Sequence, residues 1–169
     1  FYTDEEIDDF LQGIGPACEA AEQAGVQLAI ENLGLQYTEM ALLFDQQPRM
    51  KMVLDVGHAQ IMALRNRALD HIEFFYDRIA MVNLHDNHGA NMLREVVDRR
   101  KKGPLSRAEI RRIAREYDEH LPIGEGDIDF KPILSALKVR GYDDKFLMMS
   151  RDPAGFPAER EKFFSLWQG

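Results

Sequence analysis

Short apolar runs alternate along the chain with longer stretches of helical spacing. Four runs stand out, VQLAIE at 26–31, MKMVLD at 50–55, IAMVNLH at 79–85 and KFLMMS at 145–150. Runs this brief, with apolar residues on both faces, are typical of buried parallel strands, whereas helices usually need ten residues or more. We therefore predict four parallel strands that alternate with helices in βαβ units.

The first predicted helix has well-marked ends. It begins after Thr3, which forms a capping box with Glu6, and stops at Gly25, while two glycines and Pro16 inside it should kink or split it. The other helices are predicted at about 38–47, 61–76 and 132–140, with a last one from about 157.

The segment 89–117 interrupts this alternation. Two helical stretches flank a KKGP break, which predicts a helical hairpin inserted after the third strand. The segment holds nine basic and four acidic residues, so its charge is +5, and since the whole chain carries -8 the remainder carries -13. A local basic surface on an acidic protein attracts anions such as phosphate groups, although many charged helix faces are simply solvated.

Composition narrows the class of protein. An apolar fraction of 45% with 30% charged residues in a chain of 169 residues is ordinary for one globular domain with a core. No apolar run approaches the roughly 20 residues of a membrane span, and the first residues are acidic where a signal peptide would be basic. We expect a cytoplasmic protein.

Polar side chains close three of the four strands. Glu31, Asp55 and His85 each stand at the end of an apolar run, where parallel sheets and barrels gather their functional groups. A single carboxylate there is often a helix cap, but two carboxylates and an imidazole together are a ligand set for Zn, Mn or Co, and for Mg when water or substrate oxygens complete the shell.

Further polar residues follow the strands closely. His58 comes three residues after Asp55, and Asp118 and His120 are two apart, so in an extended segment both would point the same way. His71 lies in a charged helix and His88 in a loop, and both are expected at the surface.

The ordered motifs AIENL, LDVGHA, NLHDN, DEHLPIGEGDIDF and GYDD resemble the sugar phosphate isomerase/epimerase superfamily. This superfamily of xylose isomerase-like TIM barrels also includes nucleases of the endonuclease IV type. The resemblance runs from about residue 17 to 153, excluding the hairpin. It implies that residues 1–169 form one domain covering strands five to eight of a (β/α)8 barrel, the carboxyl-terminal half.

The resemblance also implies roles for the polar residues. Glu31, Asp55 and His85 match the shared metal ligands, and Glu31 matches one of two glutamates that move a proton in the isomerases. His58, Asp118 and His120 match the set that holds an additional zinc in the nuclease branch, whereas in the sugar enzymes the His58 position contacts substrate.

One position departs from the family pattern. The last strand usually ends in a glutamate, within a sequence such as LEVRDP, but here the sequence is MMSRDP and Met149 takes that place. A thioether binds hard divalent ions poorly and cannot accept a proton. Ser150 is adjacent, but alternation along a strand points it to the opposite side.

Three functions are compatible with this pattern. The first is a divalent-metal-dependent isomerase or epimerase of a sugar or sugar phosphate, in which Glu31 and His58 act in proton transfer through an enediolate. The second is a zinc phosphodiesterase acting on abasic DNA, which the acidic charge of the chain disfavours. The third is a non-catalytic relative that binds metal or sugar. For the first, the basic hairpin would act as a lid whose arginines hold a phosphate, namely Arg94, Arg99, Arg111 and Arg112.

Four parallel strands covered by helices on one side leave a sheet face and two edges open. The chain also begins on a helix and without methionine, which suggests a fragment or a processed half. We expect either an amino-terminal half-barrel polypeptide or a second copy of the chain to complete the barrel.

Overall fold

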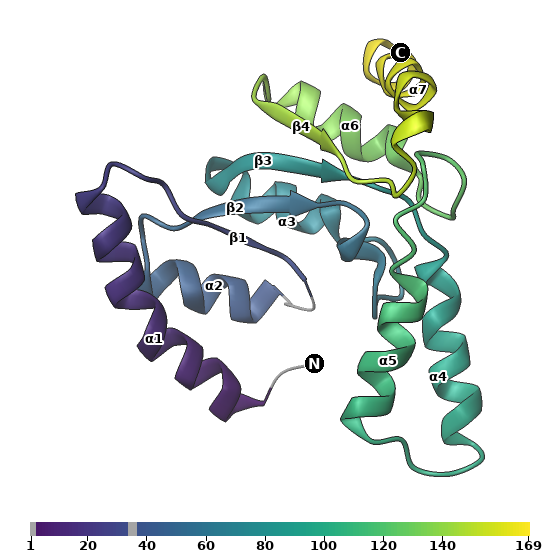
Figure 1. Ribbon diagram of the computed structural model, residues 1–169, viewed down its shortest axis with the longest axis horizontal. Coiled ribbons are helices and arrows are strands. Elements are labelled where there is room, and N and C mark those ends of the chain that lie inside the picture. Colours follow the sequence, from purple (N-terminus) through teal and green to yellow (C-terminus); the bar gives the residue numbers. More distant parts are fainter. Residues whose placement is uncertain (1–2, 34–36) are drawn as a thin grey trace.

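The computed structural model describes residues 3–33 and 37–169 and shows one four-stranded parallel sheet (Figure 1). The strands are β1 (Ala29–Glu31), β2 (Lys51–Asp55), β3 (Ile79–Leu84) and β4 (Lys145–Met148), and they lie side by side in chain order. The four predicted strands and their parallel pairing are thereby confirmed. The first is shorter than expected, because residues 26–28 precede the ladder.

Seven α-helices join and flank the described strands. They are α1 (Asp4–Gln23), α2 (Tyr37–Gln46), α3 (Ala68–Phe75), α4 (Met92–Arg100), α5 (Arg107–Tyr117), α6 (Phe130–Val139) and α7 (Phe156–Gln168). The capping box of Thr3 and Glu6 is present at the start of α1. Pro16 lies inside α1 without splitting it, so the interruption expected there does not occur.

The sheet buries one face under helices. Met52, Leu54, Val82 and Leu84 are fully buried and form the main apolar core with side chains of α2, α3 and α6. The opposite face is more open, since Val53 and Met81 are only partly buried and Leu147 is 44% exposed. The chain therefore has a covered outer face and an open inner face, as expected for part of a barrel.

The segment between β2 and α3 differs from the predicted helix at 61–76. The α-helix covers only residues 68–75 and a 3-10 turn follows it at Tyr76–Arg78, while the chain before the helix is hydrogen-bonded to the segment after β2. Asn66 holds the chain before the helix, because its amide donates to the Val56 carbonyl at 2.9 Å and its side-chain oxygen accepts from the Ala68 amide at 2.9 Å. An asparagine side chain that bonds to the backbone in this way competes with helix formation. The helix therefore begins only after Asn66.

Helices α4 and α5 lie side by side and project from the sheet at the end to which the strand arrows point (Figure 1). They enclose a small apolar cluster that is separate from the main core, made of Ile61, Met92, Val96, Ile113 and Ala114. Ser106 and Glu109 form the expected capping box at the start of α5. Within the described residues, no helix is long and apolar enough to cross a membrane.

Candidate metal centre

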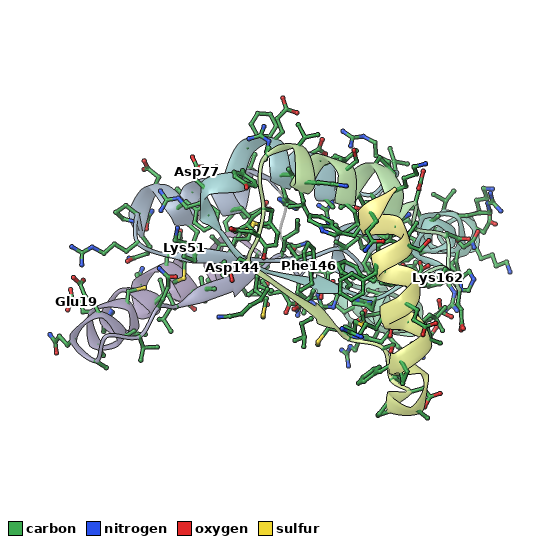
Figure 2. The ribbon with its side chains drawn as sticks, turned by 90° about the horizontal axis from the view of Figure 1, so that it is seen from above. Glu19, Lys51, Asp77, Asp144, Phe146 and Lys162 are labelled. Carbon is green, nitrogen blue, oxygen red and sulfur yellow. The ribbon has the colours of Figure 1, made fainter. Side chains whose placement is uncertain are left out.

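Two strands and the segment after a third bring polar side chains to one edge of the sheet. Glu31 ends β1, Asp55 ends β2, and His85 directly follows β3. The parallel register pairs Glu31 with Val53 and Asp55 with Asn83, so the side chains of Glu31, Asp55 and Asn83 share the open inner face. Lys51 and Asp77, labelled in Figure 2, mark the opposite, amino-terminal ends of β2 and β3.

Asp55 and His85 form the buried floor of the site. Both are fully buried, and His85 Nε2 lies 3.0 Å from Asp55 Oδ1. Asn32 fixes the backbone of Asp55 in both directions, since its side-chain oxygen accepts from the Asp55 amide at 2.7 Å and its amide donates to the Asp55 carbonyl at 3.0 Å. The Asp55 carboxylate is therefore presented from a rigid backbone.

His58 links this floor to Glu31. Its backbone amide donates to Asp55 Oδ1 at 2.8 Å, which holds the turn that brings the ring close to Asp55 and Glu31. Its Nδ1 contacts Glu31 Oε1 directly and lies 3.7 Å from Asp55 Oδ2. The other Glu31 oxygen accepts a hydrogen bond from the Asn83 amide at 3.3 Å. The Glu31 side chain is 34% exposed, so it remains accessible from solvent.

Asp118 and His120 enter the site from the loop after α5. Asp118 Oδ2 lies 3.4 Å from His58 Nε2, and Asp118 Oδ1 lies 3.4 Å from His120 Nε2 and 3.9 Å from His85 Nε2. The His120 ring stacks on the His85 ring with 3.9 Å between centroids and 5° between planes. All six polar residues expected near a metal therefore lie in one cluster.

The cluster has two overlapping groups of residues that offer potential ligand atoms. Within each group, these atoms all lie within 4.8 Å of one another. One group is Glu31, Asp55 and His58, and the other is His58, His85, Asp118 and His120. The structure thus places His58, rather than His85, with the two strand-end carboxylates, and His85 contacts Asp55 from the second group. The ligand roles of these residues stay predictions.

The unsatisfied atoms of this cluster fit a cation. Among the described residues, several buried ligand-type atoms make no hydrogen bond of good geometry, although some lie close to an oppositely charged group; they are Asp55 Oδ2, His58 Nδ1, both ring nitrogens of His85 and Asp118 Oδ1. Such atoms cost free energy unless something binds them. Three carboxylates and three imidazoles facing one another are a donor set for a borderline divalent ion such as zinc, manganese or cobalt.

The pKa shifts of the cluster residues also agree with binding of a cation. Burial alone would lower the pKa of His58, but contacts with Asp118 and Glu31 and the charge of Asp55 outweigh it and raise the pKa to about 10. Burial would raise the pKa of Asp55 and of Asp118, yet the neighbouring histidines hold both below their ordinary values. The site therefore strongly favours positive charge, which a metal ion would supply with neutral imidazole ligands.

Gly57 makes the approach of two segments possible. A β-carbon at this position would overlap the imidazole ring of His85. The turn that carries His58 therefore packs directly against the side chain of His85 without a side chain between them.

Several supporting residues were not singled out from the sequence. Asn32 and Asn83 orient Asp55 and Glu31, and Asp86 holds the loop after His120. The fully buried Asp86 carboxylate accepts from the backbone amides of Asn87, Gly124 and Ile128 at 2.8–3.1 Å. In the sequence, Asn32, Asn83 and Asp86 could have been found only by their position at or near the end of a strand.

The arginines assigned to a phosphate lid lie outside the metal cluster. In the described part of the chain, Arg99 pairs with Glu95, Arg111 with Glu6 of α1, and Arg112 approaches Glu116. Arg94 is exposed on the first turn of α4. A contact with phosphate remains a proposal.

The two other histidines differ from expectation in one case. His71 is only 1% exposed, so its assignment to the surface was wrong. It lies on the same face of α3 as Ala68, Ile72 and Phe75, all of which are buried against the core. His88 has a side chain 41% exposed and contacts Glu119 at 2.8 Å.

Met149 follows β4 and is tied to the site through its backbone. Its amide donates to the Leu84 carbonyl at 2.8 Å, and its carbonyl oxygen lies 2.8 Å from His120 Nδ1. Ser150 is buried and donates to Glu159 of α7 at 2.6 Å, so it does not replace a ligand at position 149.

A parallel α/β sheet with histidines and carboxylates at its carboxyl edge defines a barrel-type protein with a candidate metal centre. The chain belongs to the xylose isomerase-like TIM barrel family, whose model matches residues 1–162. The (β/α)8 fold class expected from the sequence is thereby confirmed, with four of the barrel strands present.

Similar proteins include two from Methanocaldococcus jannaschii. The uncharacterized protein MJ1311 is 26% identical over 152 residues, covering 84% of this chain and 43% of that protein. The uncharacterized protein MJ1614 is 25% identical over 137 residues, covering 78% and 43%. The chain thus spans less than half the length of these curated relatives.

Two solved structures share the fold. A D-tagatose 3-epimerase-like protein superimposes with a TM-score of 0.72 at 22% identity, over 99% of this chain and 56% of that one. An L-ribulose 3-epimerase gives a TM-score of 0.60 at 17% identity, over 95% and 47%. At this identity the likeness shows a shared fold.

Proposed function

We propose that this chain forms the metal-binding part of a divalent-metal-dependent isomerase or epimerase acting on a sugar or sugar phosphate. The observation that carries the proposal is that Glu31, Asp55, His58, His85, Asp118 and His120 meet in one cluster at the carboxyl ends of parallel strands. The fold shared with a D-tagatose 3-epimerase-like protein and an L-ribulose 3-epimerase supports the choice of substrate class.

In this proposal, each residue of the cluster has its own role in metal binding or proton transfer. Asp55, His85 and the carboxylate of Glu31 would hold the ion, and a bound divalent ion polarises a substrate carbonyl and stabilises enediolate charge. Glu31 is the base, since it is partly exposed and its second oxygen is oriented by Asn83. It takes a proton from the carbon beside the carbonyl and returns it to a neighbouring carbon. His58, in contact with both Glu31 and Asp118, moves the hydroxyl proton between the adjacent oxygens.

Met149 limits the chemistry to one carbon base. Epimerisation through two bases needs a proton acceptor on each side of the substrate carbon, and a thioether cannot serve as one. Isomerisation between an aldose and a ketose needs only one group that shuttles the proton on one side. The site therefore suits an isomerase better than a two-base epimerase.

The basic hairpin supplies a phosphate contact in this proposal. When the hairpin closes over the site, Arg99, Arg111 and Arg112 would exchange their present carboxylate partners for a substrate phosphate. The exposed Arg94 would bind the same phosphate. The positive charge of residues 89–117 on an otherwise acidic chain supports this role.

A zinc phosphodiesterase is the second candidate. The group of His58, His85, Asp118 and His120 favours it, because three imidazoles and a carboxylate can hold a further zinc ion beside the first. The net charge of -8 disfavours binding of a DNA backbone, so we place this activity second.

Metal analysis tests the proposal directly. The purified chain should bind at least one zinc, manganese or cobalt ion, counted by elemental analysis and titrated by calorimetry. Asp55→Asn keeps the shape of the buried side chain but removes its charge, and should weaken binding at least about tenfold. Glu125→Gln, an exposed loop carboxylate, is the matched control and should bind like the unaltered chain. Binding unaffected by Asp55→Asn would refute the assignment.

Met149→Glu tests whether chemistry was lost with the missing carboxylate. If the chain is a one-base isomerase, the unaltered protein converts ketoses or their phosphates to aldoses, and the variant gains epimerase activity on the same substrates. Both are assayed by chromatography of a panel of free and phosphorylated ketoses. Inactivity of both proteins, each loaded with metal, would instead favour a non-catalytic binding protein.

A further inference from the structure

Glu159 is a buried carboxylate outside the metal cluster. It lies in the first turn of α7 and is only 3% exposed, although its neighbours Arg160 and Glu161 are exposed. Burial of a carboxylate is costly unless hydrogen bonds compensate it, and the amino-terminal end of a helix helps to stabilise the negative charge. A buried acid in this position therefore needs specific partners.

The two partners of Glu159 come from the two segments that flank His120. Oε1 accepts from the backbone amide of Ile123 at 3.1 Å, and Oε2 accepts from Ser150 Oγ at 2.6 Å. Ile123 lies three residues after His120 in the loop that follows α5. Ser150 directly follows Met149, whose carbonyl contacts His120. One carboxylate thus joins both segments.

The same two segments meet again at His120 itself. The Arg151 amide donates to the His120 carbonyl at 3.1 Å, and His120 Nδ1 lies 2.8 Å from the Met149 carbonyl oxygen. A carbonyl can only accept, so Nδ1 carries a proton, and in the neutral ring Nε2 then keeps its lone pair. Nε2 is the atom that faces Asp118 in the cluster, at 3.4 Å. The contact with Met149 therefore sets the tautomer that a metal ligand needs.

His120 requires such support because its backbone is strained. Its φ of 53° lies in the left-handed region, which is unfavourable for a residue with a β-carbon and persists only where the surroundings impose it. Asp86 holds the loop on one side through the amides of Gly124 and Ile128. Glu159 holds it on the other.

Helix α7 lies directly against this loop. A β-carbon at Gly124 would meet the side chain of Lys162, one turn after Glu159. Figure 2 shows Lys162 on α7, which runs along one side of the molecule. The loop is therefore packed between Asp86 on one side and α7 on the other, and Glu159 is the residue of α7 that forms a hydrogen bond with it.

We infer that Glu159 is a positioning residue that fixes the orientation and tautomer of His120, and so sets the affinity of the group formed by His58, His85, Asp118 and His120 for a divalent cation. The inference rests on the proposed function, because it assigns the device that shapes one part of the same metal centre. Glu159 acts through Ile123 and Ser150 and touches no ligand atom.

The test uses three variants of the full chain. Glu159→Ala removes both hydrogen bonds, Glu159→Gln keeps an acceptor for the Ile123 amide and can still pair with Ser150, and Glu161→Ala is an exposed control on the same helix. Cobalt(II) is titrated by visible absorption, and the tautomer of His120 is read from nitrogen-15 shifts of the metal-free protein. A general loss of folding stability would by itself change neither the cobalt titration of the folded chain nor the tautomer of His120.

We expect Glu159→Ala to weaken binding of the cobalt ion that involves His120 by about 10–100-fold. The same variant should lose the signal of protonated Nδ1 at His120. Glu159→Gln should recover most of the affinity, and Glu161→Ala should behave like the unaltered chain. An unchanged titration and an unchanged tautomer in Glu159→Ala would overturn the inference, as would a Glu159→Gln variant that is as impaired as Glu159→Ala.

Two further outcomes separate this inference from the proposed function. If the unaltered chain binds no cobalt, the proposed function fails, while the tautomer of His120 in Glu159→Ala still decides whether Glu159 positions the ring. If Glu159→Ala does not fold, Ser150→Ala removes one of the two hydrogen bonds and leaves the carboxylate in place. Weaker cobalt binding in Ser150→Ala supports the inference, and unchanged binding contradicts it.

Discussion

His71 is a buried titratable side chain that the metal centre does not use. It is 1% exposed, stacks on Phe75 with 6.2 Å between ring centroids, and among the described residues neither ring nitrogen has a hydrogen-bond partner. Burial, together with the charge of Arg67, lowers its pKa to about 4, and Asp70 opposes this only in part. The ring is therefore neutral in the folded protein throughout the ordinary pH range.

This pKa gives a pH dependence of stability with a definite sign. Between about pH 6.5 and pH 4 the unfolded chain binds a proton at His71 and the folded chain does not, so acid favours unfolding. The gap corresponds to on the order of 3 kcal/mol. His71→Phe should remove this part of the loss between pH 7 and pH 4.5, measured by urea unfolding of both proteins. Parallel pH profiles would contradict the expectation.

At this scale the sequence indicates which polar residues lie together at the sheet edge better than it indicates which residues are buried. Glu31, Asp55 and His85 stand out because each polar residue ends an apolar strand, while their ligand roles stay predictions. The environment of His71 was misjudged because Asp70 and Glu73 make its helix look charged, while residues 68, 71, 72 and 75 form the buried face at helical spacing. The supporting role of Asp86 required the three-dimensional path of the loop.

The helical hairpin is an element with its own apolar cluster. Ile113 of α5 is fully buried in that cluster with Met92 and Val96 of α4, and the cluster is distinct from the core under the sheet. The pair of Arg111 and Glu6 gives the hairpin an additional contact with α1. An element held in this way can loosen without unfolding the sheet.

Ile113→Ala tests this independence. The truncation should cost about 2–4 kcal/mol locally and speed amide hydrogen exchange throughout α4 and α5, while amides of β2 and β3 keep their protection. The matched control is Ile133→Ala in α6, 2% exposed in the main core, which should speed exchange across the sheet as well. Equal effects of the two variants on β2 and β3 would show that hairpin and sheet unfold together.

Element positions were predicted well where periodicity and caps agree. The four strands fall where the pattern placed them, because each is a short apolar run, and α5 begins at the capping box of Ser106 and Glu109. The helix before β3 was overextended, since apolar residues at 61–63 continue the pattern although Asn66 binds the backbone and ends it. The hydrogen bond from the Asn66 side chain to the Val56 carbonyl does not alter the hydrophobic periodicity of the sequence, so the pattern could not predict it.

The open inner face governs the behaviour of the whole molecule. It exposes Leu147 and leaves Val53 and Met81 partly covered, and in the described residues β1 and β4 each pair with a strand on one side only. Exposed apolar surface beside free strand edges favours association. We propose that an amino-terminal half-barrel or a second copy of the chain covers this face.

Light scattering of the isolated chain tests this proposal. A molecular mass above that of one 19.5 kDa chain is expected in solution. Leu147→Glu should shift the population toward single chains, because it places a charge on the face that associates. Val139→Glu, on an exposed position of α6, is the control and should leave the mass unchanged. A stable single chain at all concentrations would count against the proposal.

The missing β-carbon at Gly57 has a consequence for how such sequences can change. Because the imidazole of His85 occupies the space that any larger residue at 57 would need, position 57 cannot enlarge while His85 is present. Evolution can replace the glycine only after, or together with, the loss of the neighbouring imidazole. Natural variants bearing a bulkier amino acid at 57 are therefore expected to carry a small residue at 85 and to have abandoned cation-dependent activity.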